Sequence, residues 1–137
     1  MKILITGATG FVGKHLVKYL KDKHKLYILV RSDSDYSSLC VKQSFTFVDT
    51  IDQLAEYLCH EKIDGIIHLA SLYVVEHKSE QLKDLMLANI YLGTAILEAC
   101  KKASVKWFLN TGTIWQNYDV PDKSDEYNPV NLYAASK

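Results

Sequence analysis

Residues 1–13 of this 137-residue chain read MKILITGATGFVG, and this stretch decides the expected fold. An apolar run over 3–5 leads into Gly7, Gly10 and Gly13, and an amphipathic helical pattern follows. Glycines here allow a sharp turn, a close approach of backbone to phosphate, and tight packing of helix on strand. The unpaired N–H groups of the first helical turn would face the anion. The spacing G-x-x-G-x-x-G predicts a dinucleotide-binding turn, with an ordinary tight turn as the alternative.

The rest of the chain alternates apolar runs with helical patterns. Strands are expected at 2–6, 25–30, 45–48, 65–69 and 106–109, and helices at 11–21, 51–59 and 81–102. Apolar strands separated by helices indicate a parallel sheet covered on both faces. We therefore predict an α/β fold, a doubly wound Rossmann-like sheet, in one domain over residues 1–137. A polar loop over 111–128 follows the last strand, and because such a domain normally adds another strand, we expect the fold to be C-terminally incomplete.

Composition argues against several classes of partner. Sixteen Lys and Arg balance sixteen Asp and Glu, so nothing favours nucleic acid or an anionic membrane. No apolar run approaches the ~20 residues that span a bilayer, and the N-terminal strand leaves no room for a signal peptide. Cys40, Cys59 and Cys100 lie far apart, as is typical of reduced thiols in a cytoplasmic protein. The histidines lack metal-ligand spacing, so no metal is expected, and His68 is interpreted as structural.

Tyr133 and Lys137 lie four residues apart after the fifth expected strand. On a helix this spacing places both side chains on one face. An ammonium group beside a phenol stabilises the phenolate and lowers its pKa from ~10, which suits acid–base chemistry near neutrality. Two exposed helix residues at chance spacing are the alternative, but the position in a nucleotide-binding sheet favours a catalytic pair.

Taken in order, these patterns resemble the short-chain dehydrogenase/reductase superfamily, in its extended, nucleotide-sugar-modifying branch of the NAD-dependent epimerase/dehydratase type. The resemblance covers essentially the whole chain, through TGATGFVG at 6–13, IIHLAS at 66–71, Asn89 with GTAILEAC at 93–100, a hydroxyl cluster after the fifth strand, and YAASK at 133–137. Several ordered motifs at such intervals are more specific than any one of them.

The resemblance implies a catalytic set of Thr111, Tyr133 and Lys137. The family's hydroxyl residue precedes an aromatic by four positions, and Thr111 precedes Trp115 in this way, with Thr113 as the alternative. In the implied mechanism Tyr133 donates a proton to the substrate carbonyl as hydride arrives from the nicotinamide. Thr111 holds the carbonyl oxygen, while Lys137 lowers the tyrosine pKa and binds the nicotinamide ribose.

The resemblance also implies a set of cofactor-binding residues. They are Gly7, Thr9, Gly10, Phe11, Val12, Gly13, Arg31, Ser32, Asp49, Thr50, Leu69, Ala70, Ser71, Asn89, Tyr133 and Lys137. Arg31 beside Ser32 favours NADP, because arginine suits a 2′-phosphate. NAD stays possible, since Asp33 could instead accept from a 2′-hydroxyl. Asp49 could alternatively cap the helix that follows it.

The segments NTGTIWQNY (110–118) and NPVNLYAASK (128–137) are similar to sugar-nucleotide 4-ketoreductases of the CDP-abequose and paratose synthase type. They imply NADPH-dependent reduction of a 4-keto sugar nucleotide in deoxysugar synthesis for surface polysaccharides. A 4-epimerase or 4,6-dehydratase is the enzymatic alternative. Gly112 and Thr113 stand where dehydratases carry an acidic pair, and Arg31 argues against the tightly bound NAD of an epimerase.

A non-catalytic nucleotide-binding sensor is the alternative of another class, against which the complete catalytic set argues. These residues alone are expected to show at most trace reductase activity. By resemblance, a homodimer would form through the helix at 81–102 and the helix near Tyr133.

Overall fold

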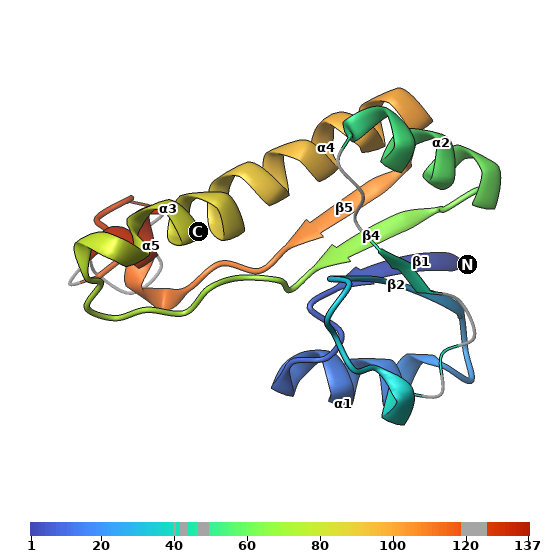
Figure 1. Ribbon diagram of the computed structural model, residues 1–137, viewed down its shortest axis with the longest axis horizontal. Helices are drawn as coiled ribbons and strands as arrows, with labels where there is room; N and C mark the ends of the chain where they lie inside the picture. The colour runs from blue at the N-terminus through green and yellow to red at the C-terminus, as the bar shows by residue number, and fades with distance from the viewer. Residues whose placement is uncertain (40, 42–43, 47–49, 119–125) are drawn as a thin grey trace. The chain divides into compact units, whose positions relative to one another are not determined.

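The computed structural model of the chain groups into two compact units (Figure 1). The residues that it describes are 1–39, 41, 44–46, 50–118 and 126–137. The first unit comprises Met1–Ala70 and Thr94–Asn110, and the second comprises Ser71–Gly93 and Thr111–Lys137. The single domain expected over residues 1–137 stays a prediction.

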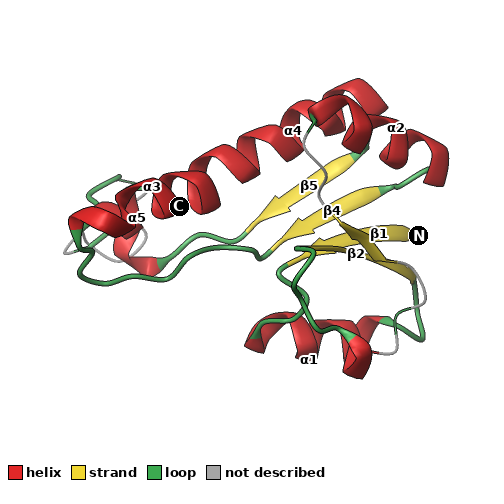
Figure 2. Ribbon diagram, in the orientation of Figure 1, coloured by secondary structure: helices red, strands yellow, loops and turns green. Residues whose placement is uncertain are grey.

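The helices and strands follow the predicted order (Figure 2). The strands are β1 Lys2–Thr6, β2 Lys25–Val30, β3 Ser44–Thr46, β4 Gly65–His68 and β5 Trp107–Asn110. The α-helices are α1 Phe11–Leu20, α2 Ile51–Glu61, α3 Leu82–Met86, α4 Leu92–Ala103 and α5 Leu132–Ala135. A π-helical turn, η3 Leu87–Tyr91, and the 3-10 turns η1 Ser37–Leu39, η2 Ser79–Gln81 and η4 Ile114–Gln116 complete the described elements. The end of the predicted third strand lies outside the described residues.

All five strands run parallel, in the order β3-β2-β1-β4-β5. The chain moves from β1 outward to β3 and then returns to place β4 on the other side of β1. This reversal at β1 is the doubly wound topology, so the predicted α/β class is confirmed. Because the strands are parallel, the ends of β1, β2 and β4 lie along one edge of the sheet.

The sheet is covered on both faces, as the apolar strands predict. On one face Ile3 and Ile5 of β1 belong to a buried cluster that includes Val17 of α1. Successive side chains of a strand point to opposite faces, so the fully buried Leu4 packs on the other face of the sheet. Figure 2 shows α1 on one side of the strands, and α2 and α4 on the other.

The long helix predicted over 81–102 is continuous but not regular. The segments α3, η3 and α4 follow one another without a break, and η3 is a π-helical turn. Such turns insert one residue into the helical repeat and often mark functional sites. Asn89 lies in this turn and bonds the backbone of Leu72, in the loop after β4. The apolar repeat of the sequence predicts a regular helix. The irregularity accompanies a bond to Leu72, which the repeat does not reveal.

Candidate functional site

The turn between β1 and α1 forms one part of the candidate site, within the first unit. Gly7 follows β1 with a φ of +68°, a left-handed conformation that glycine adopts without strain. A Cβ at Gly7 would lie 2.7 Å from the Ala70 amide nitrogen and 2.8 Å from the Leu69 carbonyl carbon. The turn and the segment after β4 therefore meet backbone to backbone, which requires glycine at this position.

The other two glycines of the turn have different surroundings. A Cβ at Gly13 would overlap the Gly7 carbonyl oxygen and lie 2.6 Å from the Ala8 Cα, so α1 packs directly on the turn. A Cβ at Gly10 would meet, among the described residues, only that same oxygen, at 3.3 Å. Gly13 thus serves the packing of α1 on the turn, whereas a Cβ at Gly10 would make a single tight contact with the described backbone.

The start of α1 carries no side-chain cap. Its N-cap residue is Gly10, and the first turn contains no acidic side chain. Phe11 is 82% exposed and Val12 is also exposed, while Thr9 is half-buried in the turn before them. The first-turn N–H groups and the positive end of the helix dipole are therefore available to an anion.

A buried pair of polar side chains, Thr6 and His68, lies next to the turn between β1 and α1. The Thr6 hydroxyl lies 2.7 Å from Nδ1 of His68, and both side chains are buried. The same hydroxyl oxygen accepts a 3.1 Å bond from the Ala70 N–H. The Thr6 hydroxyl thus links His68 to the backbone of Ala70 and fixes the segment that touches Gly7. The structural role predicted for His68 fits this arrangement.

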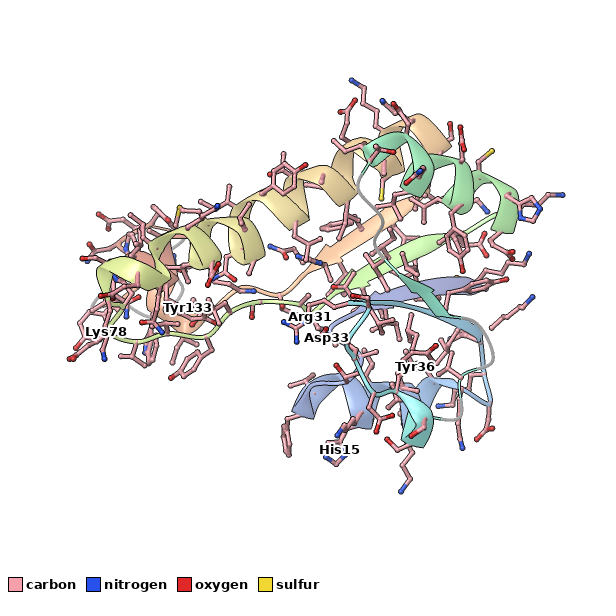
Figure 3. All side chains as sticks on the ribbon, in the orientation of Figure 1. His15, Arg31, Asp33, Tyr36, Lys78 and Tyr133 are labelled. Carbon is pink, nitrogen blue, oxygen red and sulfur yellow. The ribbon has the colours of Figure 1, made fainter. Side chains whose placement is uncertain are left out.

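The end of β2 carries the charged residues expected to select the cofactor. Arg31 and Ser32 are exposed there, and Arg31 Nε lies 3.5 Å from Asp33 Oδ1 (Figure 3). Because both side chains are well exposed, this ion pair is weak and open to exchange. β2 pairs directly with β1, so these residues follow a strand adjacent to the one that leads into the glycine turn.

At the start of α2, only Thr50 of the predicted cofactor-binding residues Asp49 and Thr50 can be placed. Thr50 is the N-cap of α2, and its hydroxyl oxygen accepts a 3.2 Å bond from the Gln53 N–H. Asp49 lies outside the described residues. The capping role considered for Asp49 is thus filled by its neighbour Thr50.

In the second unit, Asn89 connects three segments. Its Oδ1 accepts from the Leu72 N–H at 2.7 Å, and its Nδ2 donates to the Leu72 carbonyl at 3.1 Å. Nδ2 also donates to Ser136 Oγ at 3.0 Å, and Ser136 Oγ donates to the Tyr133 carbonyl at 2.8 Å. This network ties the loop after β4, the π turn and α5 together, and accounts for the amide on an apolar helix.

Tyr133 lies at the centre of an aromatic group. The residue is only 8% exposed, and α5 is capped at its start by Asn131, whose Oδ1 accepts from the Ala134 N–H at 2.8 Å. The rings of Tyr73 and Trp115 have centroids 5.1 and 6.2 Å from that of Tyr133, both in edge-on geometry. The aromatic ring of Tyr133 is thus held by packing on two sides.

Lys137, the other half of the predicted pair, follows the end of α5. Helix α5 spans Leu132–Ala135, Ser136 is its C-cap, and Lys137 follows directly. It is half-buried, and this burial lowers the pKa of its ammonium group. A lowered pKa is suited to a lysine that acts near a reacting group rather than one on an open surface.

The two candidate hydroxyl residues, Thr111 and Thr113, lie in different places relative to η4. Thr113 is the N-cap of η4: its Oγ1 accepts from the Trp115 N–H at 3.4 Å, and its own N–H donates to Gln116 Oε1 at 3.0 Å. Thr111 lies before this turn and is half-buried. The Thr113 oxygen thus serves the backbone of η4, and Thr111 stays the predicted hydroxyl residue, with Thr113 as the alternative. Ser71, the remaining predicted residue, is exposed at the start of the second unit.

Comparison with known protein families places this chain in one of them. The NAD dependent epimerase/dehydratase family matches residues 3–137. The chain belongs to this family. Among its relatives is a dTDP-D-glucose 4,6-dehydratase from Dictyostelium discoideum, 35% identical over 99% of this chain and 38% of that protein. A CDP-abequose synthase from Salmonella typhimurium is 30% identical over 85% of this chain and 40% of that protein.

Solved structures agree on the fold of this epimerase/dehydratase family member. A UDP-N-acetylglucosamine 4-epimerase from Bacillus cereus matches with a TM-score of 0.78 at 25% identity, over 100% of this chain and 47% of that one. A UDP-glucose 4-epimerase from Stenotrophomonas maltophila, solved with bound NAD, has the same TM-score at 22% identity, covering 100% and 45%. The chain thus spans less than half the length of the relatives that it matches.

Three contributors to the site of this epimerase/dehydratase chain are missed by sequence reasoning. Thr6 bonds His68 and Ala70 across the sheet, Tyr73 packs on Tyr133, and Ser136 links Asn89 to α5. Each contacts a partner that is far away in the sequence: Ser136 is 47 residues from Asn89, and Tyr73 is 60 residues from Tyr133. No local pattern carries that information.

The described residues contain neither a metal-binding group of side chains nor a helix suited to crossing a membrane. Within them, no three His, Cys, Asp or Glu side chains lie together in a group that could hold a metal ion. In that same part of the chain, no helix combines the length and apolar character needed to cross a membrane. Of the cysteines, Cys59 and Cys100 are free thiols, and burial raises the pKa of Cys100 to about 11, while Cys40 lies outside the described residues.

Proposed function

We propose that this protein reduces a 4-keto sugar nucleotide with NADPH, in the synthesis of a deoxysugar for surface polysaccharides. The observation that carries the proposal is the held position of Tyr133, which the Asn89–Ser136 network and two aromatic rings fix in a family of nicotinamide-dependent enzymes. A pure nucleotide sensor would have no need of a phenol so restrained.

The glycine turn fits the diphosphate of a dinucleotide. Its helix start has no side-chain cap, and a glycine at position 10 keeps a Cβ away from the first-turn N–H groups. The N–H groups of the first turn of α1 would bind the diphosphate, and Leu69 and Ala70 would lie alongside the bound cofactor. When bound, the nicotinamide supplies the hydride, and the protein supplies orientation and electrostatics.

Thr111, Tyr133 and Lys137 would handle the proton and the carbonyl oxygen. The Tyr133 hydroxyl would donate its proton to the oxygen, and the Thr111 hydroxyl would hold that oxygen as negative charge develops. The charged ammonium group of the half-buried Lys137 would stabilise the phenolate left on Tyr133 and bind ribose hydroxyls.

Arg31 supports NADP rather than NAD as the cofactor. Arg31→Ala is expected to weaken NADPH binding by about 1.5–3 kcal/mol, the usual loss for a hydrogen bond to a charged group. NADH binding should be unchanged, because NADH lacks the 2′-phosphate. Titration calorimetry with both cofactors measures the difference.

Asp33 provides the matched control, since its carboxylate competes for Arg31 at 3.5 Å. Asp33→Asn should leave NADPH binding equal or tighter. Equal weakening of NADPH and NADH by Arg31→Ala would contradict the proposed role of Arg31. Loss of NADH binding in Asp33→Asn would assign the selection to Asp33 and to NAD.

The reaction class is tested by product analysis on the full protein. CDP- and dTDP-linked 4-keto-6-deoxy sugars should be reduced, and the amount of NADPH consumed should equal the amount of sugar reduced. Gly112 and Thr113 after Thr111, in place of an acidic pair, support reduction over dehydration. Loss of water from a nucleotide-linked glucose, or epimerisation without NADPH consumption, would replace the reductase by a dehydratase or an epimerase.

We also propose a homodimer through the long helix. Apolar side chains along it are exposed, namely Leu82, Leu87, Ile90, Tyr91 and Leu97. Large exposed apolar side chains are typical of a surface that a partner covers, and a second copy of this protein would cover them.

A further inference from the structure

Tyr73 is a large aromatic residue left mainly in contact with solvent beside the proposed proton donor. Its side chain is 62% exposed, in the loop that follows β4. Its ring stacks on Trp115 of η4 with a centroid distance of 6.0 Å and an angle of 27°. The Tyr73 ring also meets that of Tyr133 edge-on, at 5.1 Å. Three segments of the second unit thus bring three rings together, with one ring mainly uncovered.

The backbone on both sides of Tyr73 is held in place. On one side, the N–H and the carbonyl of Leu72 both bond Asn89, at 2.7 and 3.1 Å. On the other side, the Val75 carbonyl accepts from Asn131 Nδ2 at 3.3 Å. Hydrogen bonds on both sides thus restrain the loop backbone that carries the exposed Tyr73 ring. An exposed ring that is fixed before a ligand arrives loses little entropy on binding.

We propose that Tyr73 and Trp115 form an aromatic platform that binds the sugar ring of the substrate. The apolar C–H face of a pyranose packs well on an aromatic face, and removal of hydroxyls in a deoxysugar enlarges that apolar surface. This inference rests on the proposed function: the part of the substrate that meets Tyr133 carries the carbonyl, and the carbonyl lies on the sugar. A nucleobase also stacks on aromatic rings, and the experiment separates the two.

The experiment compares nucleotide sugars with the corresponding nucleotides in the full protein. Binding of CDP-, dTDP- and UDP-glucose, and of CDP, dTDP and UDP, is measured by calorimetry for the wild type, Tyr73→Ala and Tyr73→Phe. Tyr73→Ala should weaken the tightest-binding nucleotide sugar about tenfold, a typical loss for one aromatic contact. The matching nucleotide and NADPH should bind as in the wild type, and Tyr73→Phe should bind normally because the ring is kept.

Tyr19→Ala is the matched control, because Tyr19 is similarly exposed, at 66%, but lies on α1 in the first unit. It should leave nucleotide-sugar binding unchanged. Unchanged sugar binding in Tyr73→Ala, or equal weakening of nucleotide and nucleotide sugar, would overturn the platform. The reaction class can fail separately: a wild type that binds nucleotide sugars through Tyr73 but does not reduce them keeps the platform and loses the reductase.

Discussion

Tyr133→Phe is expected to lower kcat by about 10²–10⁴-fold, the range that positioned general acids contribute. Phenylalanine keeps the ring that packs against Tyr73 and Trp115 but removes the proton that the carbonyl oxygen needs. The fold and the affinities for NADPH and nucleotide sugar should therefore stay close to those of the wild type. Steady-state kinetics, calorimetry and thermal unfolding measure the three quantities.

Tyr127→Phe is the matched control for this prediction. The Tyr127 hydroxyl is also beside α5, where it donates to the Ala135 carbonyl at 3.1 Å, but the residue is exposed. Its removal should change kcat by less than about threefold, as expected for an exposed hydrogen bond. Turnover in Tyr133→Phe within tenfold of the wild type would contradict the catalytic role of Tyr133.

The second large effect is expected at the glycine turn. Gly10→Ala should weaken NADPH and NADH alike by at least tenfold, about 1.4 kcal/mol, because the new Cβ projects into the space assigned to the diphosphate. Stability should change by less than about 1 kcal/mol, since the poorer N-cap is offset by a more restricted unfolded chain. Cofactor titration and thermal unfolding are the measurements.

Gly13→Ala provides the contrast. A Cβ there would run into the backbone of Gly7 and Ala8, which cannot move aside cheaply, so unfolding should become easier by about 1–3 kcal/mol or more. Loss of affinity without loss of stability in Gly10→Ala, and loss of stability in Gly13→Ala, would separate the binding glycine from the packing glycine. Full cofactor affinity in a folded Gly10→Ala protein would contradict the anion-binding role.

Local patterns were enough to predict most of the fold. The apolar run over 3–5 and the glycines after it predict β1, the turn and α1, because each depends on neighbouring residues alone. The doubly wound parallel class also follows, since parallel strands with helical crossovers allow few topologies. The π turn at Leu87–Tyr91 could not be predicted, because it accompanies bonds from Asn89 to a loop and to Ser136.

The candidate site was predicted less completely than the fold. Asn89 was identified by resemblance, and its need for a polar partner follows from its position on an apolar helix. The identity of those partners does not, because Leu72 and Ser136 approach only in three dimensions. The same holds for Tyr73: nothing in the loop sequence indicates that its ring reaches Tyr133.

Hydride transfer itself is the most direct test of the central claim, that this chain binds a nicotinamide cofactor and uses Tyr133 to reduce a sugar carbonyl. The full protein is incubated with a 4-keto sugar nucleotide and NADPH in which deuterium replaces both hydrogens at C4 of the nicotinamide, so that either face delivers deuterium. Mass spectrometry should find one deuterium on the reduced sugar carbon of the wild-type product, and no such product with Tyr133→Phe. A product without deuterium, or labelled product formed equally well by Tyr133→Phe, would contradict the account.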